Sequence, residues 1–182
     1  RCKCRDLRGS DRFFSSGALL LSLGIDPGTA TTGWGLVRED DSGLAAVAYG
    51  VITTPAGEEL PARLQSLYRE LTALIRQHRP DTAAVEKLFF QRNVSTAMSV
   101  GQARGVVLLA LAESGLSVAE YGPNEVKQAL SGYGGAGKKQ MQSMIQILLG
   151  LPAPPHPDDA ADALAVAVCH LHSMRLNQLM QK

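Results

Sequence analysis

Four acidic residues occupy positions where carboxylates from distant parts of the chain could meet. Asp26 follows a short apolar run, and Glu86 closes a second one. Asp159 and Asp162 are three residues apart near the start of an Ala-rich helical segment, so they share one helix face. Sites in open α/β sheets form at strand ends. If the two apolar runs are neighbouring strands, the sequence predicts that Asp26 and Glu86 converge and that the Asp-x-x-Asp face lies against them.

Such a carboxylate cluster is suited to divalent cations with a preference for oxygen ligands. Mg²⁺ binds carboxylates and keeps several waters, and the lack of an accompanying His or Cys cluster favours Mg²⁺ or Mn²⁺ over zinc. Two ions about 4 Å apart can activate a water and neutralise the leaving oxygen during phosphodiester hydrolysis. Without a cation the four acids would repel one another and raise one another's pKa. The chemistry predicted is therefore metal-assisted phosphodiester hydrolysis.

Each acid also has a simpler interpretation. Asp26, followed by Pro and Gly, could be a turn residue, and Glu86 could be a strand-end charge facing water. Asp158 is interpreted as the N-cap of the last helix. Asp159 and Asp162 could be solvated first-turn acids that suit the helix dipole, although alanines and other apolar residues surround them. The pattern alone leaves the metal site and these alternatives open.

Hydrophobic periodicity predicts one α/β domain that would position these acids. The sequence Asp-Asp-Ser-Gly at 40–43 indicates a hairpin turn between two early strands, and later strands alternate with helices. This order predicts a mixed five-stranded sheet flanked by helices. The predicted strands span 19–25, 32–38, 44–53, 82–86 and 116–121, and the predicted helices span 61–78, 93–114, 124–130, 138–149 and 158–174.

Composition sets wider limits on the class of protein. The chain has 182 residues, of which 45% are hydrophobic and 19% charged, as expected for one globular domain. A net charge of +1 gives no argument for nucleic-acid binding, so any basic patch must be local. Three cysteines without a disulfide pattern favour a cytoplasmic setting, with Cys169 as a small core residue. No apolar stretch reaches the roughly 20 residues of a membrane helix, so no membrane association is expected.

The N-terminal segment 1–17 is polar and basic without a clear period, and we expect it to be a disordered extension of a domain spanning 18–182. Its charged start before an apolar run superficially resembles a signal peptide. The apolar run is short, however, and leads into Gly24-Ile-Asp-Pro-Gly rather than a small-residue cleavage site. A buried first strand is therefore the preferred interpretation.

Several motifs together resemble the RuvC-type Holliday-junction resolvases, which are crossover junction endodeoxyribonucleases. The resemblance runs in order from about Leu21 to about His172. Each motif alone is moderately specific, and together they are highly specific. The motifs are Gly24-Ile-Asp-Pro-Gly-Thr, Thr32-Gly-Trp-Gly, Val85-Glu-Lys-Leu-Phe-Phe, Gly101-Gln-Ala-Arg-Gly-Val, Tyr121-Gly-Pro-Asn-Glu-Val-Lys-Gln and Asp159-Ala-Ala-Asp-Ala-Leu-Ala.

The resemblance implies an RNase H-like fold and a homodimer with two active sites that cuts four-way DNA junctions by paired symmetric nicks in recombination and DNA repair. It places Asp26, Glu86, Asp159 and Asp162 on the family's catalytic, metal-binding positions, with Mg²⁺ as cofactor, Mn²⁺ as an alternative and two ions per site. It also implies partnership with a branch-migration complex of the RuvA and RuvB type. The DNA-binding positions that it implies are Phe89, Lys127 and Lys138.

Physical chemistry agrees with these DNA-binding assignments. Phe89 follows a catalytic strand, and an aromatic ring that stacks on an unpaired base contributes about 1–3 kcal/mol. Lys127 and Lys138 can bind phosphate or stabilise developing charge. Arg92 and Arg104 are each open between a phosphate contact and a surface ion pair. Lys139 could bind phosphate in the same way, with a solvated helix residue as the alternative.

Three further points remain open at this stage. His156 is interpreted as a surface-loop residue, although its position near the last acids would allow proton transfer. The small-residue segment Ser95–Gly105 is a candidate dimer interface, with a core role as the alternative. The Gly24-Ile-Asp-Pro-Gly-Thr motif also resembles the phosphate loop of actin-like ATPases, but one domain of this length leaves no room for their second domain. A non-catalytic junction-binding protein and another nuclease of the same fold are the remaining alternatives.

Overall fold

A computed structural model describes residues 19–87 and 94–180, with side chains in the second range from residue 97 onward. The predicted extension 1–17, Phe89, Phe90 and Arg92 lie outside the described residues, and the predictions made for them stand untested.

The centre of the protein is a mixed five-stranded sheet with the strand order β3-β2-β1-β4-β5. The first three strands form an antiparallel meander, and β1 then pairs in parallel with β4, which pairs in parallel with β5. This arrangement confirms the predicted mixed sheet and places the first and fourth strands side by side. The strands are β1 (Leu20–Asp26), β2 (Thr31–Asp40), β3 (Gly43–Thr53), β4 (Thr82–Glu86) and β5 (Val118–Tyr121).

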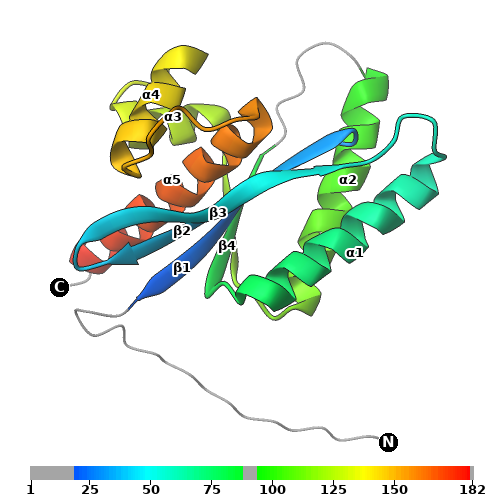
Figure 1. The fold of residues 1–182 in the computed structure, drawn as a ribbon, viewed down its shortest axis with the longest axis horizontal. Helices are drawn as coiled ribbons and strands as arrows, with labels where there is room; N and C mark the ends of the chain where they lie inside the picture. Colours follow the sequence, from blue (N-terminus) through cyan, green and yellow to red (C-terminus); the bar gives the residue numbers. More distant parts are fainter. Residues whose placement is uncertain (1–18, 88–93, 181–182) are drawn as a thin grey trace, which may run out of the picture.

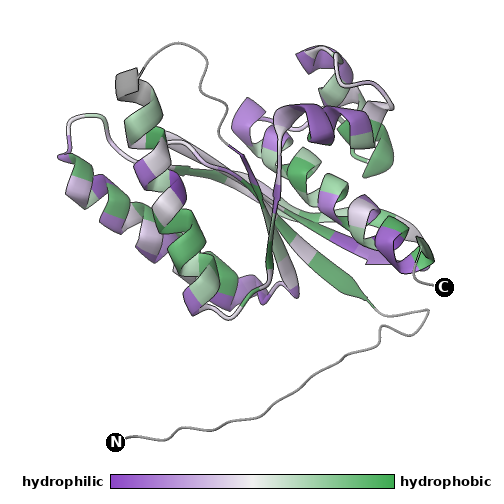
Figure 2. Cartoon of the chain, turned by 180° about the vertical axis from the view of Figure 1, so that it is seen from behind, coloured by the Kyte–Doolittle hydropathy of each residue, from purple (hydrophilic) through white to green (hydrophobic). Residues whose placement is uncertain are grey.

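Helices cover both faces of this sheet (Figure 1). On one face lie α1 (Leu60–His78) and α2 (Val94–Glu113), which pack against each other. On the other face α5 (Asp158–Met180) crosses β1 and β2, with α3 (Pro123–Ser131) and α4 (Lys138–Leu148) beside its start. Hydrophobic and hydrophilic residues alternate along α1, as expected for a helix with one buried side (Figure 2).

Each face of the sheet has its own hydrophobic core, because successive side chains of a strand point to opposite faces. Leu23 and Ile25 of β1 are fully buried with α1 and α2. Leu20 belongs to the core under α5, which also contains the predicted core residue Cys169. The two cores hold β1 and β4 between two helical layers and so fix the strand ends that carry Asp26 and Glu86.

Three glycines of β1 and β2 allow α5 to lie directly on the sheet. A Cβ atom on Gly24 would be 2.1 Å from the carbonyl oxygen of Ala163, and one on Gly33 would be 1.9 Å from that of Asp159. At Gly35 the added atom would be 2.8 Å from Leu164. Any larger residue would push the helix away from the sheet. The strand glycines therefore determine where the first turns of α5 lie.

The last helix begins at the predicted residue, but its end and its N-cap differ from the prediction. It continues to Met180 rather than ending at 174, because the apolar pattern fades while no Pro or Gly interrupts the helix-forming residues. Asp158 is not the N-cap, because the carbonyl oxygen of Pro157 accepts the first N–H groups, from Ala160 and Ala161.

Among the described residues, none of the helices combines the length and apolar character that crossing a membrane would require.

Candidate active site

The parallel pairing of β1 with β4 brings Asp26 and Glu86 together at the C-terminal ends of these two strands. Ile25 is in register with Val85, so the acids that follow them end neighbouring strands that run in the same direction. Their side chains are hydrogen-bonded to each other. The prediction that the two acids converge if these strands are neighbours is fulfilled in the structure.

This contact requires the two carboxyl groups to share a proton. Burial, followed by the charge of Glu86 and the hydrogen bond to it, raises the pKa of Asp26 to about 8. Burial also raises the pKa of Glu86, while the hydrogen bond from Asp26 lowers it. The opposite effects of that bond place the proton on Asp26. At neutral pH the pair therefore carries roughly one negative charge rather than two.

The two acids of α5 lie within electrostatic range of this pair. The charge of Asp162 raises the pKa values of both Asp26 and Glu86, and that of Asp159 raises the pKa of Asp26. Burial is the main cause that raises the pKa of Asp162 itself. All four predicted acids therefore lie in one region, and two of them are in direct contact.

The donor set fits a divalent cation in its chemistry and only partly in its spacing. Carboxylate oxygens are hard ligands of the kind that Mg²⁺ binds. The proton shared by Asp26 and Glu86 neutralises one of their negative charges, as a bound cation would. Yet within residues 19–87 and 94–180 no three His, Cys, Asp or Glu residues are packed closely enough to hold an ion as they stand. A cation would therefore have to draw Asp159 and Asp162 toward the paired acids.

Two lysines of the α3–α4 region face this cluster. Lys127 of α3 lowers the pKa values of Glu86 and Asp162 through its positive charge. Lys138, the first residue of α4, has its Nζ atom 2.9 Å from Asp158 Oδ2 and 3.9 Å from Asp162 Oδ2. The two lysines assigned by resemblance thus lie near the acids, although their role toward DNA stays a prediction.

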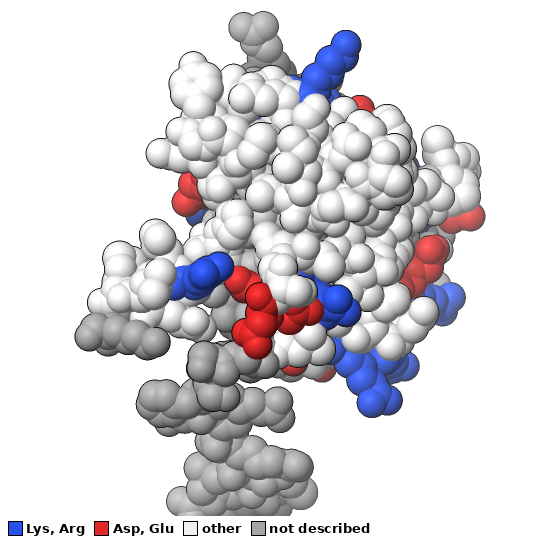
Figure 3. Space-filling model, turned by 60° about the vertical axis from the view of Figure 1, so that its left-hand side comes forward, with Lys and Arg blue, Asp and Glu red and all other residues white. Residues whose placement is uncertain are grey.

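The other candidate side chains take no part in the cluster. Arg104 forms an ion pair with Glu120, which supports the surface ion-pair interpretation. His156 is exposed in the connector before α5, as expected for a surface-loop histidine. On the face that Figure 3 shows, Lys and Arg form small separate groups on a mostly neutral surface, in keeping with the low net charge.

Hydrogen bonds hold the turn that follows Asp26. Thr32 Oγ1 donates to the carbonyl oxygen of Gly28 at 2.7 Å. The carbonyl oxygen of Thr29 accepts bonds from Thr54 Oγ1 at 2.6 Å and from Arg63 Nη2 at 3.0 Å. This network ties the β1–β2 connection to the end of β3 and to α1. It fixes the position of the strand end from which Asp26 projects.

A buried polar contact anchors α5 to the parallel strands β4 and β5. His170 Nε2 lies 2.8 Å from Thr82 Oγ1 in β4, and its Nδ1 lies 3.0 Å from the Tyr121 hydroxyl in β5. Burial lowers the pKa of His170. Neither this contact nor the role of the strand glycines was foreseen from sequence. The glycines within the quoted motifs were the available signal, and the helix that they admit could not be identified without the fold.

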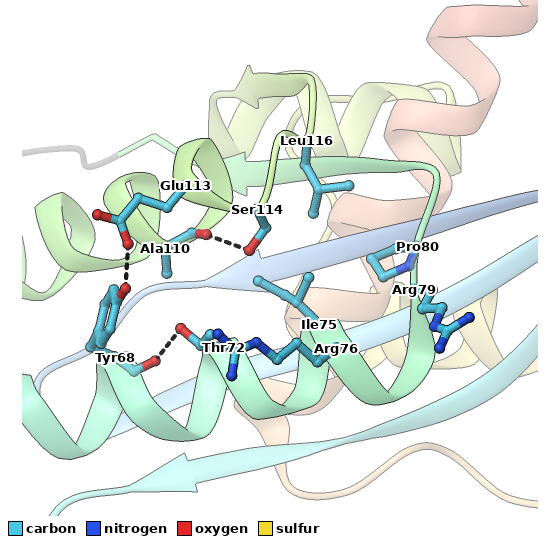
Figure 4. A pocket seen from close by; sticks show the side chains of 10 residues that line it. All are labelled: Tyr68, Thr72, Ile75, Arg76, Arg79, Pro80, Ala110, Glu113, Ser114 and Leu116. Atoms are coloured by element: carbon cyan, nitrogen blue, oxygen red, sulfur yellow. Dashed lines mark hydrogen bonds between the residues drawn. The ribbon is translucent and has the colours of Figure 1, made fainter. Parts of the chain in front are cut away.

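A hollow of about 510 Å³ lies away from the acids, between α1 and α2. Its lining includes Pro80 and Leu116, which precede β4 and β5. These residues therefore lie at the N-terminal ends of the strands, whereas Glu86 lies at the C-terminal end of β4. Figure 4 shows Tyr68 bonded to Glu113 across the two helices at its rim. The position of this hollow separates it from the carboxylate chemistry.

A sheet of this strand order, with clustered carboxylates at the ends of its two central parallel strands, defines a nuclease domain of the RNase H-like class. The family model described as "Crossover junction endodeoxyribonuclease RuvC" matches residues 22–170. The chain belongs to this family. Membership confirms the resemblance inferred from the motifs and the prediction of a Holliday-junction endonuclease, and it decides against the ATPase alternative.

Individual relatives agree with the family match over most of the chain. The crossover junction endodeoxyribonuclease RuvC of Syntrophomonas wolfei is 56% identical over 159 residues, covering 87% of this chain and 92% of the relative. The structure of Thermus thermophilus RuvC is 35% identical, with a TM-score of 0.81, over 87% of this chain and 97% of that one. A complex of that protein with a Holliday junction substrate matches with 34% identity and a TM-score of 0.79, over 86% and 96% of the two chains.

Proposed function

We propose that this protein resolves Holliday junctions by paired symmetric nicks, through metal-assisted phosphodiester hydrolysis, in DNA recombination and repair. The observation that carries the proposal is the buried, hydrogen-bonded pair Asp26 and Glu86 at one sheet edge, with Asp159 and Asp162 in electrostatic contact. Family membership supplies the junction as substrate, in keeping with the solved complex of the Thermus thermophilus relative.

The four acids are proposed to hold Mg²⁺, with Mn²⁺ as an alternative, as two ions per active site. Bound ions would supply an activated water and neutralise the leaving oxygen. Asp26 must first release its proton, because a protonated carboxyl group is a poor ligand for a cation. The pKa of about 8 therefore couples metal binding to loss of that proton.

Basic and aromatic side chains around the acids are proposed to hold the DNA. Lys127 and Lys138 face the cluster and can pair with phosphate oxygens beside the scissile bond. Phe89 follows the Glu86 strand in the sequence and is proposed to stack on a base near the junction centre. These roles explain why cations accompany an acidic site that must accept a polyanion.

The active unit is proposed to be a homodimer, because two nicks placed symmetrically require two sites related by a two-fold axis. The helix α2 supports this proposal, since some of its large apolar side chains are exposed to solvent while others are buried in the core. Met98 is 65% exposed and Leu109 53% exposed, and both lie on one face with Gly105. We expect Leu109→Lys to give monomers in light scattering and Leu176→Lys, another exposed leucine, to leave the dimer intact.

The protein is proposed to act in the cytoplasm. Its proposed partner there is a branch-migration complex of the RuvA and RuvB type. Cys169, the cysteine within the described ranges, is buried and unpaired, as expected in a reducing compartment.

The test is incubation of the protein with a synthetic mobile four-way junction and Mg²⁺. The expected products are nicks at symmetric positions in two opposing strands, absent when EDTA replaces Mg²⁺. An RNA–DNA hybrid and a linear duplex of the same sequence are the controls. Preferential cutting of the hybrid would contradict the proposal and favour another nuclease of the same fold.

A further inference from the structure

Asp158 lies beside the four predicted metal-binding acids and makes different contacts. Its Oδ2 atom is 2.9 Å from Lys138 Nζ, and its Oδ1 atom accepts a hydrogen bond of 2.8 Å from Gln142 Nε2. Lys138 and Gln142 are four residues apart in α4, so they project from the same helix face. Both oxygens of Asp158 are thus bound by α4, whose start lies next to the start of α5 (Figure 1).

The lysine stands between two carboxylates at unequal distances. At 2.9 Å its contact with Asp158 has the length of a charge-assisted hydrogen bond, whereas 3.9 Å to Asp162 Oδ2 is too long for one. The ammonium group therefore lies next to Asp162 but donates its hydrogen bond to Asp158. The hydrogen bond that Lys138 donates to Asp158 is also the largest cause that raises the pKa of this lysine.

A lysine at this position would compete with a divalent cation if nothing held it. Its ammonium sits on a flexible four-carbon stem, and Asp162 is the next carboxylate within reach. A direct bond to Asp162 would occupy oxygens that a metal ion needs. Asp158, whose orientation is fixed by Gln142, removes this competitor and still leaves the positive charge beside the site, where a phosphate would approach.

We propose that Asp158 is a positioning residue that holds Lys138 off Asp162 and thereby keeps Asp162 available to the metal. The inference rests on the proposed function, because it assumes that Asp162 is a metal ligand. It assigns to Asp158 a role distinct from that of the four ligands, carried out through Lys138 rather than through contact with the ion.

The test is calorimetric titration of the full chain with Mn²⁺ in the absence of DNA. We expect Asp158→Asn to weaken Mn²⁺ binding by about fivefold, the scale of an exposed ion pair. Asp158→Glu should recover part of the loss. Asp41→Asn makes the same chemical change in the turn between β2 and β3, at the far end of β2 from the acids, and should leave binding unchanged.

Two comparisons separate this role from a simple loss of negative charge near the site. In a Lys138→Met background, Asp158→Asn should no longer weaken binding, because no ammonium remains to compete. Gln142→Leu changes no charge and should still weaken binding, because Asp158 loses its orientation. Equal losses in both Lys138 backgrounds, or full affinity in Gln142→Leu, would overturn the proposal.

The same titrations separate the inference from the function on which it rests. If the wild type binds Mn²⁺ and cuts junctions while Asp158→Asn binds as well as the wild type, this inference alone is wrong. If the wild type does not bind Mn²⁺, or binds it no better than Asp26→Asn does, both the metal site and the role of Asp158 are wrong. Thermal unfolding of each variant establishes that it is folded before titration.

Discussion

The shared proton between Asp26 and Glu86 predicts that Asp26→Asn stabilises the metal-free protein while it abolishes cleavage. Asparagine is close in shape to a protonated aspartate and can donate the same hydrogen bond to Glu86. It carries no charge at any pH, however, so the buried pair can never become doubly negative. The gain should therefore grow as the pH rises above the ordinary pKa of an aspartate, where the unfolded chain ionises and the folded wild type does not.

The sign of the effect follows from the direction of the pKa shift. The pKa of Asp26 is raised from 3.8 to about 8 in the folded state. Below pH 4 the group is protonated in both states and the mutation has little effect. Between pH 4 and 8 the folded protein keeps a proton that the unfolded chain has released, so wild-type stability falls as pH rises. Above pH 8 the loss is complete and stays constant.

The size of the effect is set by the same shift. A change of roughly four units at about 1.36 kcal/mol per unit gives a ceiling of ~6 kcal/mol. Glu86 can take part of the proton, and ionised carboxylates draw in water, so we expect a gain of ~2–3 kcal/mol at pH 8. The free energy of unfolding, measured with urea in EDTA at pH 4 and pH 8.5, should be similar for variant and wild type at pH 4 and higher for the variant at pH 8.5.

Activity supplies the second half of this prediction. With Mg²⁺, wild-type cleavage should increase with pH up to about 8, as Asp26 loses its proton. The Asp26→Asn variant should still bind the junction in Ca²⁺ or without metal, and should not cut it. If the difference in stability between variant and wild type is the same at both pH values, the shared proton is refuted. If the variant cuts normally, the catalytic role of Asp26 is refuted. Asp41→Asn is the control for an exposed acid.

Three other perturbations test separate parts of the structure. Gly33→Ala should lower the melting temperature and impair cleavage, because the added methyl group meets the backbone of Asp159, whereas Gly57→Ala, with open space around it, should do neither; equal melting temperatures for the two variants would argue against close packing of α5. Phe89→Ala should weaken junction cleavage and leave the melting temperature nearly unchanged, and a large thermal loss would place the ring in the core. Because burial lowers the pKa of His170, the wild type should lose stability as the pH falls below 6.5, and His170→Gln should weaken this pH dependence. Urea unfolding at pH 7.5 and 5.5 measures the effect, and a pH dependence equal to that of the wild type would contradict it.

The sequence by itself determined the order of the elements and the identity of the candidate acids. Strand 82–86 was predicted to the residue, because a short apolar run between Pro80 and a charged segment allows little else. Helix ends were less certain where no Pro or Gly marks them, as at Met180. The motifs were sufficient to identify the family, since six of them occur in order along the chain.

Tertiary structure alone decided how these parts act on one another. The pairing of β1 with β4 spans about 60 residues of sequence, and only this pairing places Asp26 against Glu86 and produces their shared proton. The contact of Gly33 with Asp159 and the bond of Asp158 to Lys138 join segments with no common pattern in sequence. Periodicity reports which face of an element is buried. The partner that buries it, and the charges that this partner brings, depend on contacts between segments that are distant in the chain.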